Sequence, residues 1–513
     1  MRNLLLAALL VSTTLTGCAV NPVTGENQLS LISKAQELEI GKKNYAPLRQ
    51  SQGGDYVVDT QLAAYVSEVG QKLAAVSDRN LPYEFKVLNS SAPNAWALPG
   101  GKISLNRGLL TALKSEAELA AVLGHEITHA AAKHTASGMS RGMLIQGAVM
   151  AAVVGVQGKD YAQLASLGAG IGAQLVTRKY GRDAEREADF YGMKYMSKAG
   201  YDPQGAVALQ RTFVKLSEGG NQDWLSGLFA SHPPSQERVE NNIKTAATLP
   251  RSGSRGENRF KIRTAHIKRT KPAYEAYDEG RKAFRKGDIS KAGALVGKAI
   301  RLEPREGHFH ALLGDIEEKN NRYKTAKQHY DKAIALHDGF FYYYLKRGQV
   351  NASLKASDAA KRDLEKSIQL LPTANAHHSL GDIAKQEGKL NAAKSYYKKA
   401  ASNKSVEGKA AYRALMTLDL ADNPQNYIKL RTGLDNKGRL KAEISNPTPN
   451  NVQDIVVAIQ YRDSSGRIRQ MEHPLRGVLA AGKKQLVDLG MQHIPKAQLA
   501  NIKSGIISAR IAK

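Results

Sequence analysis

The chain is almost without cysteine. Cys18 is the only one among 513 residues, so no disulfide can form within the chain. The fold must therefore rest on hydrophobic cores, for which a hydrophobic content of 42% is sufficient. A chain of this length is expected to contain about three domains.

The N-terminus lacks a hydrophobic run long enough to span a bilayer. Arg2 is followed by an apolar stretch over 4–11 and by small residues just before residue 18, a pattern typical of a secretory signal. We predict this signal over 1–17. The Leu-Thr-Gly-Cys sequence that ends at Cys18 resembles a bacterial lipobox, whose cysteine is lipidated. With Ala19 next, the motif implies a periplasmic protein anchored to the outer membrane by lipidated Cys18.

Two further apolar stretches, over 143–156 and 161–176, are each too short to span a membrane comfortably. They are consistent with buried helices, with a hairpin that covers a functional site or touches lipid, or with a re-entrant hairpin. Their composition leaves these alternatives open.

Acidic residues are scarce relative to basic ones. The chain has 74 Lys and Arg against 47 Asp and Glu, a net charge of +27. In a cytosolic protein this excess would favour nucleic-acid binding. In an exported protein, anionic lipid head groups or acidic protein clients fit better, and a plain solvated basic surface is equally consistent. We therefore expect no nucleic-acid partner.

The sequence HExxH occurs at 125–129, with His125, Glu126 and His129. A chain of this composition would contain the motif by chance only about 0.02 times. Ser115 and Glu118 match a helix-capping pattern before an apolar run, so the motif is expected on a helix. Residues four apart share a helical face, so both imidazoles can hold one Zn²⁺ while Glu126 serves as general base.

A catalytic zinc usually has three protein ligands. The best acidic candidates are Glu185 and Asp189, which are four residues apart and share a face of a predicted helix. One could bind the metal while the other orients a ligand imidazole. Spacing alone does not decide between them.

A repeat follows the peptidase-like region. Gly280, Gly314, Gly348 and Gly381 are spaced by 34, 34 and 33 residues, and small or aromatic residues recur at constant distances after each. The period is typical of tetratricopeptide repeats, which form an α-solenoid with a concave groove for peptides or proteins. A purely structural solenoid is the alternative.

The remaining segments complete the predicted domain organisation. The basic, turn-rich segment 251–271 is interpreted as a linker. Alternating segments over 440–444, 455–461, 468–471, 485–489 and 505–512 predict strands of a small β-sandwich. We expect a multidomain, mainly α protein: a signal over 1–17, an α+β zincin-type peptidase domain over 18–250, the linker, repeats over 272–424 and the sandwich over 425–513.

HExxH followed by ExxAD at 185–189, with a Leu-Pro-Gly-Gly stretch at 98–101, resembles the gluzincin metalloprotease family of HtpX and the CAAX prenyl proteases. The Asn-Pro-Val-Thr-Gly sequence at 21–25 resembles the periplasmic, BepA- and LoiP-like branch of that family. A peptidase followed by tetratricopeptide repeats is similar to BepA-type outer-membrane quality-control proteases. The C-terminal β-domain does not belong to that plan.

The resemblance implies roles for individual residues. Glu185 becomes the third metal ligand, Asp189 the partner that supports a ligand imidazole, and Glu126 the general base. The segment 94–101 corresponds to an edge strand and turn beside the cleft, where an extended peptide could add as a strand.

A further family motif, HPxxxxR, matches residues 232–238. His232 precedes a proline, so it is presented from a loop, and the resemblance implies that it can occupy the open zinc position and hold the site latent. A loop histidine in a structural turn is the plainer alternative. The resemblance gives Arg238 a catalytic role on the substrate or the oxyanion. His134 is interpreted as structural or supporting rather than as a ligand.

The expected activity is that of a metalloendopeptidase with one Zn²⁺ per chain. It would hydrolyse unfolded or misassembled cell-envelope proteins, with repeats that bind clients or the outer-membrane protein assembly machinery. The alternative is a largely latent protease that acts mainly as a chaperone or adaptor in outer-membrane protein assembly.

Overall fold

The computed structural model describes residues 18–143, 180–218, 228–229, 231–463, 465–491 and 494–512. The predicted signal over 1–17 and the apolar stretches, apart from Met143, lie outside these residues. Within the described ranges, every helix is too short or too polar to cross a membrane. The chain divides into two compact units, Met1–Arg347 and Gly348–Lys513, each of which is considered by itself.

The first unit contains a three-stranded sheet in the order β3-β5-β4. Strand β3 (Glu84–Leu88) runs parallel to β5 (Lys102–Asn106), and β4 (Ala95–Leu98) runs antiparallel to β5. Gly100 and Gly101 have φ of +76° and +81°, a conformation that glycine adopts readily, and they let the chain turn tightly from β4 into β5. The predicted edge strand and turn over 94–101 are therefore confirmed.

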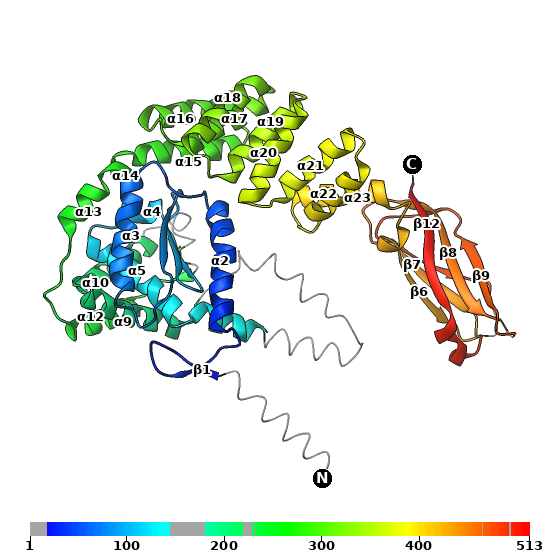
Figure 1. The fold of residues 1–513 in the computed structure, drawn as a ribbon, viewed down its shortest axis with the longest axis horizontal. Coiled ribbons are helices and arrows are strands. Elements are labelled where there is room, and N and C mark those ends of the chain that lie inside the picture. The colour runs from blue at the N-terminus through cyan, green and yellow to red at the C-terminus, as the bar shows by residue number, and fades with distance from the viewer. Residues whose placement is uncertain are drawn as a thin grey trace, which may run out of the picture. The chain divides into compact units, whose positions relative to one another are not determined.

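Helices cover this sheet on two sides. Figure 1 shows the strands between α2 (Lys34–Ser51) and the pair α3 (Thr60–Ala74) and α5 (Glu116–Ala131). A complete capping box of Ser33 and Gln36 begins α2. The apolar stripe of α3 is buried against the sheet through Leu62, Val66, Val69 and Leu73.

The HExxH motif lies on α5, which is buried along its whole length. The side chain of Ser115 caps this helix by accepting a hydrogen bond from Glu118 N. Helix α9 (Arg182–Lys198), which carries ExxAD, packs closely on α5. A Cβ on Gly124 would lie 2.9 Å from Gly192 O, so the two helices can approach this closely only because both positions are glycine. This approach brings Glu185 opposite the two histidines.

Within the described ranges, α10 (Gln204–Glu218) and α12 (Gln236–Ala247) follow α9 in the first unit. A short hairpin of β1 (Cys18–Val20) and β2 (Asn27–Leu29) precedes α2, and a one-turn helix α4 (Arg107–Ala112) follows β5.

The segment 251–271, interpreted from its charge as a turn-rich linker, is mostly helical. It contains α13 (Glu257–Arg263) and α14 (Ala265–Arg269). Phe260 and Ile267 are fully buried in the core of the first unit, and Arg259 contacts Glu68 and Glu116. These two buried apolar side chains hold the segment against the core of the first unit, and charge counting alone does not reveal them.

The repeats begin in the first unit with α15 (Lys271–Arg285), α16 (Ile289–Leu302), α17 (Gly307–Lys319) and α18 (Tyr323–Leu336). Helix α19 (Phe341–Ser353) contains the boundary between the units. The recurring glycine makes room for the recurring aromatic residue, because a Cβ on Gly314 would lie 2.7 Å from the ring of Tyr330. The predicted tetratricopeptide pattern is confirmed here.

Glu306 joins the peptidase part to the first repeats. It is 2% exposed. Its carboxylate accepts hydrogen bonds from Asn89 Nδ2 at 2.9 Å, Tyr274 OH at 2.8 Å and His308 N at 3.0 Å. Asn89 follows β3 directly, so the first repeats contact the loop that leads into the edge strand β4.

Replacing Glu306 with alanine should destabilise the first unit by roughly 3 kcal/mol, because it leaves several buried donors without an acceptor. Trp96 is buried in this unit, so urea unfolding followed by tryptophan fluorescence reports on it. Glu279→Ala on α15 is the control, since that side chain is 60% exposed. Equal unfolding midpoints for the two variants would contradict the role of Glu306.

The second unit continues the repeats with α20 (Ser357–Leu370), α21 (Ala374–Gln386), α22 (Leu390–Ala401) and a further helix, α23 (Val406–Asp419). A Cβ on Gly381 would lie 2.5 Å from the ring of Tyr397, which repeats the packing of Gly314 on Tyr330.

The predicted β-sandwich forms the rest of this unit. In one sheet β8 (Val452–Arg462) pairs with β9 (Ile468–Pro474), β10 (Val478–Leu479) and β12 (Lys503–Ile511). In the other, β7 (Leu440–Ser445) lies between β6 (Lys429–Leu434) and β11 (Lys484–Asp488). All pairs are antiparallel, and alternate residues of β7 and β8 fill one core. The expected strands are all present, and β6 and β10 are additional. The predicted fold class is confirmed.

Candidate metal centre

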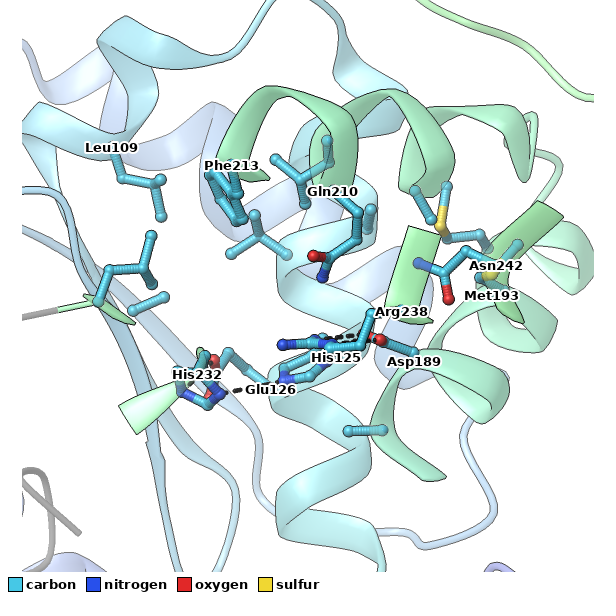
Figure 2. Close-up of a pocket in the computed structure, with 18 residues that line it drawn as sticks. Leu109, His125, Glu126, Asp189, Met193, Gln210, Phe213, His232, Arg238 and Asn242 are labelled. Atoms are coloured by element: carbon cyan, nitrogen blue, oxygen red, sulfur yellow. Dashed lines mark hydrogen bonds and ion pairs between the residues drawn. The ribbon is translucent and has the colours of Figure 1, made fainter. Parts of the chain in front are cut away.

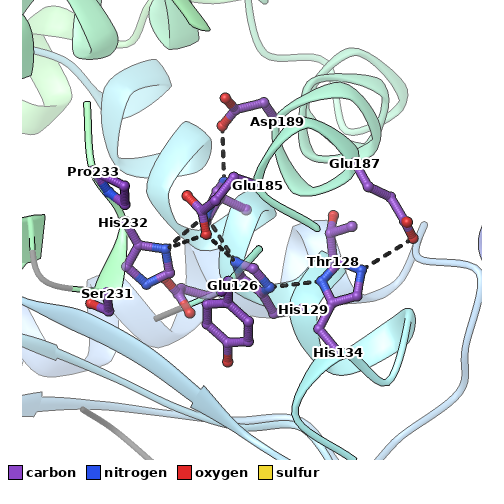
Figure 3. A network of polar contacts seen from close by, with 12 residues as sticks. Glu126, Thr128, His129, His134, Glu185, Glu187, Asp189, Ser231, His232 and Pro233 are labelled. Carbon is purple, nitrogen blue, oxygen red and sulfur yellow. Dashed lines mark hydrogen bonds and ion pairs between the residues drawn. The ribbon is translucent and has the colours of Figure 1, made fainter. Parts of the chain in front are cut away.

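Four side chains converge beside α5 and α9 (Figure 3). His125 and His129 come from α5, Glu185 from α9 and His232 from the loop before α12. One donor atom from each lies within 4.8 Å of all the others. All four residues are at most 9% exposed, so these polar atoms are withdrawn from bulk solvent.

The distances between the donor atoms fit a metal ion. His125 Nε2 lies 3.0 Å from His129 Nε2 and 3.2 Å from His232 Nδ1. Glu185 Oε1 lies 3.3 Å from His129 Nε2 and 2.9 Å from His232 Nδ1. Tetrahedral coordination with zinc–nitrogen bonds of 2.0–2.1 Å places neighbouring ligand atoms about 3.3 Å apart.

The chemistry of the donors supports the same conclusion. Neutral imidazole carries only one N–H, and a carboxylate carries none. Three imidazoles and one carboxylate therefore bring more lone pairs to one point than they have protons to share. A cation at that point would satisfy them together, so the residues present fit a metal.

Asp189 supports His125 from outside the cluster. Its Oδ1 lies 2.9 Å from His125 Nδ1. Burial opposes the charged carboxyl, but Arg238 and His125 hold the pKa of Asp189 below its usual value. The carboxylate thus accepts a hydrogen bond from Nδ1–H and leaves the lone pair of Nε2 directed toward the cluster. This is the supporting position predicted for Asp189.

Arg238 lies where the motif predicts, but its contacts favour a different role. Its Nε and Nη2 donate to Asp189 at 2.7 Å each. Its Nη1 lies 2.9 Å from Glu185 Oε2 and 3.2 Å from Pro233 O. A guanidinium held by two carboxylates is well placed to keep them in position. These contacts favour a positioning role of Arg238 for Asp189 and Glu185, and its catalytic role stays a prediction.

A second chain of polar contacts supports His129. His129 Nδ1 lies 2.8 Å from His134 Nδ1, and His134 Nε2 lies 3.3 Å from Glu187 Oε1. Asn21 Nδ2 donates to the same Glu187 oxygen at 2.8 Å. His134 is a supporting residue, as expected. Glu187 points away from the cluster but contacts His134. No sequence pattern predicts that Asn21 and Glu187 meet.

Replacing Glu187 with alanine should weaken metal binding by roughly 10-fold, the low end of the effect of removing a support of a metal-binding imidazole, because Glu187 acts on His129 only through His134. The measurement is competition with a fluorescent chelator. Asp183→Ala on the same helix is the control, because that side chain is 97% exposed. Unchanged metal affinity in Glu187→Ala would show that His129 does not depend on this contact chain.

Glu126 lies beside the cluster without belonging to it. Its Oε1 is 3.5 Å from His232 Nε2, and its Oε2 is buried without a hydrogen-bond partner among the described residues. Burial raises the pKa of Glu126 above its usual value. A carboxyl with a raised pKa next to a metal site can take up and return a proton, as the general base of a hydrolase must.

Comparison with known proteins places these residues in a family. The model of Peptidase family M48 matches residues 60–246, which include all four clustered residues, and the tetratricopeptide repeat model matches 308–336 and 374–405. Metalloprotease YcaL of Escherichia coli is 32% identical over 189 residues, covering 35% of this chain and 71% of YcaL.

Two other relatives are covered to a smaller extent. The putative beta-barrel assembly-enhancing protease of Vibrio cholerae is 29% identical over 43% of this chain and 46% of its own length. Mitochondrial metalloendopeptidase OMA1 of Schizosaccharomyces pombe is 30% identical over 42% of this chain and 63% of its own length. The resemblance predicted from HExxH and ExxAD is confirmed, since the chain belongs to peptidase family M48, a family of metalloproteases.

Proposed function

We propose that the protein is a zinc metalloendopeptidase of the bacterial periplasm that hydrolyses misfolded or stalled cell-envelope proteins. The observation that carries the proposal is the convergence of His125, His129, Glu185 and His232 within 4.8 Å. Three imidazole nitrogens and a carboxylate oxygen are a usual donor set for zinc. His125, His129 and Glu185 are the proposed ligands of a single ion, as predicted.

A zinc ion held there would act as a Lewis acid, which lowers the pKa of a water to about 7 and polarises the scissile carbonyl. Glu126 takes the proton of the attacking water and then delivers it to the leaving amine. Asp189 keeps His125 in one tautomer through the 2.9 Å contact with Nδ1. Arg238 keeps the carboxylates of Asp189 and Glu185 in place.

The proposed clients follow from several features. Several relatives are named as beta-barrel assembly-enhancing proteases, and the repeats offer a binding surface for unfolded envelope proteins or for the outer-membrane protein assembly machinery. The net charge of +27 suits acidic clients or anionic lipid head groups. A lipid on Cys18 would hold the enzyme at the outer membrane.

The second candidate function is a largely latent protease that serves mainly as a chaperone or adaptor. The position of His232 favours it. Its Nδ1 lies among the donor atoms and its Nε2 lies 3.5 Å from Glu126, so it occupies the space that a substrate carbonyl and a water would need. In this state His232 would be a fourth ligand and would have to leave before hydrolysis.

The test compares the wild-type protein with His232→Ala on an unfolded outer-membrane β-barrel protein diluted from urea, with casein as a second unfolded substrate. Cleavage that rises in His232→Ala supports a protease restrained by His232. A wild-type protein that keeps the β-barrel protein soluble, while neither variant cleaves any substrate, would contradict the protease proposal and support the chaperone.

A further inference from the structure

Helix α10 carries one polar residue in an apolar stripe. Positions 206, 209, 210 and 213 share one face of a helix. Ala206, Leu209 and Phe213 are apolar, whereas Gln210 is 4% exposed. Burying an amide without partners is unfavourable, so a face that served packing alone would carry an apolar residue at 210.

The stripe forms one wall of a pocket next to the metal centre. The pocket has a volume of about 40 Å³ and is bordered by His125 and Glu126. Figure 2 shows the amide of Gln210 projecting from α10 toward His125 and Arg238. Most of the wall is apolar, with Leu109, Met193 and Phe213 among the lining residues.

Gln210 Oε1 is buried and accepts no hydrogen bond from any described residue. Most buried polar atoms in proteins are hydrogen-bonded, so an unpaired acceptor at a pocket wall needs an explanation. A donor supplied by a bound molecule would give Oε1 the hydrogen bond that the protein does not.

The position of the pocket indicates what would supply this donor. Glu126 acts on the water that attacks the scissile bond, so a pocket bordered by Glu126 receives a side chain next to that bond. Ala95 of the edge strand β4 also borders the pocket. An extended peptide along β4 would direct every second side chain to the same side, one of them into this pocket.

The size and the polarity of the pocket limit which substrate side chain can enter it. The pocket volume of about 40 Å³ favours a short substrate side chain over a long one. An apolar wall disfavours a charged group. A small hydroxyl side chain fits both limits.

We propose that Gln210 determines specificity by accepting a hydrogen bond from a threonine or serine hydroxyl next to the scissile bond. The inference rests on the proposed peptidase function. Valine has the shape of threonine but no donor, so a bound valine leaves Oε1 unpaired. Sites built to bind a hydroxyl discriminate strongly against an analogue that lacks it.

The experiment uses the full chain and a set of peptides that differ only by threonine or valine at one position near the cleaved bond. Two quantities are measured: the threonine-to-valine ratio of kcat/KM, and the ratio of Kd values for the same peptides on Glu126→Gln, where turnover is blocked. The variant is Gln210→Met, which keeps the length of the side chain. Gln204→Met makes the same change at an exposed position of α10.

The wild-type protein and Gln204→Met should prefer threonine over valine by at least about tenfold at one position, and Gln210→Met should lose or reverse this preference. Wild-type cleavage of both peptides at equal rates at every position would overturn the role of Gln210 and leave the peptidase function intact. Absence of cleavage by both the wild-type protein and His232→Ala, with zinc bound, would overturn the peptidase function, and equal Kd values for the threonine and valine peptides on Glu126→Gln would overturn the role of Gln210.

Discussion

Glu126→Gln should lower peptide hydrolysis by roughly 10²–10⁴-fold, the usual contribution of a general base, while the protein keeps its metal. Glutamine has the size of glutamate but cannot take the proton of the attacking water. Glu126 is not among the four clustered residues, so the metal site should be unaffected. The measurement combines kcat/KM on an unfolded substrate with metal content by mass spectrometry.

Glu39→Gln on α2 is the matched control, because Glu39 is exposed and remote from the cluster in the sequence. It should behave as the wild-type protein does in both measurements. Full turnover by Glu126→Gln would exclude this residue as the base. Loss of metal from Glu126→Gln would instead make Glu126 part of the metal site.

Glu185→Gln should lose more than about 100-fold in metal affinity, since removing a ligand costs more than the 10–100-fold of a supporting residue. The rate of peptide hydrolysis should fall as metal binding is lost. Glu185 supplies the only carboxylate of the cluster, and its neighbours His232 and His125 hold its pKa well below the usual value although burial acts in the opposite direction. The amide has no charge with which to attract the cation.

Asp183→Asn on the same helix is the control for this change, because its side chain is 97% exposed. Circular dichroism of Glu185→Gln separates a lost ligand from a lost fold. A folded Glu185→Gln protein with wild-type metal affinity would show that the ion is held without this residue. Asp189 would then become the next candidate, since the two lie on one helical face.

The sequence predicted the parts of the site that lie on one element. His125, Glu126 and His129 are neighbours on α5, and helical spacing was enough to place them together. The choice between Glu185 and Asp189 could not come from spacing, because both lie on the same face of α9. The fold separates them: Glu185 reaches the cluster, whereas Asp189 reaches the outer nitrogen of His125.

Contacts between residues that are far apart in the sequence could not be predicted from the sequence. Arg238 belongs to a recognisable motif, but its role depends on the two carboxylates of α9 that it contacts. Glu187 and Asn21 are 166 positions apart, and no periodicity relates them. Gln210 would be assigned to an exposed face by its polarity alone, and only its burial beside the metal centre makes it a candidate.

The packing of the repeats could be predicted from the sequence, whereas the packing of the segment before them could not. The glycine spacing predicted the helix pairs because each glycine faces an aromatic or branched residue of its own repeat, as Gly314 faces Tyr330. The segment 251–271 was interpreted as a linker because it is basic and turn-rich. Phe260 and Ile267 nevertheless bury it against the peptidase core, since two well-placed apolar side chains are enough to dock short helices.

The most direct test of the account is hydrolysis of unfolded casein by metal-stripped protein, before and after one equivalent of Zn²⁺ is added. The account predicts no cleavage before the addition, recovery afterwards with one zinc bound per chain, and no recovery in Glu185→Gln. Equal cleavage by the stripped and the reloaded wild-type protein would contradict the claim that a single metal ion, held by His125, His129 and Glu185, carries the activity.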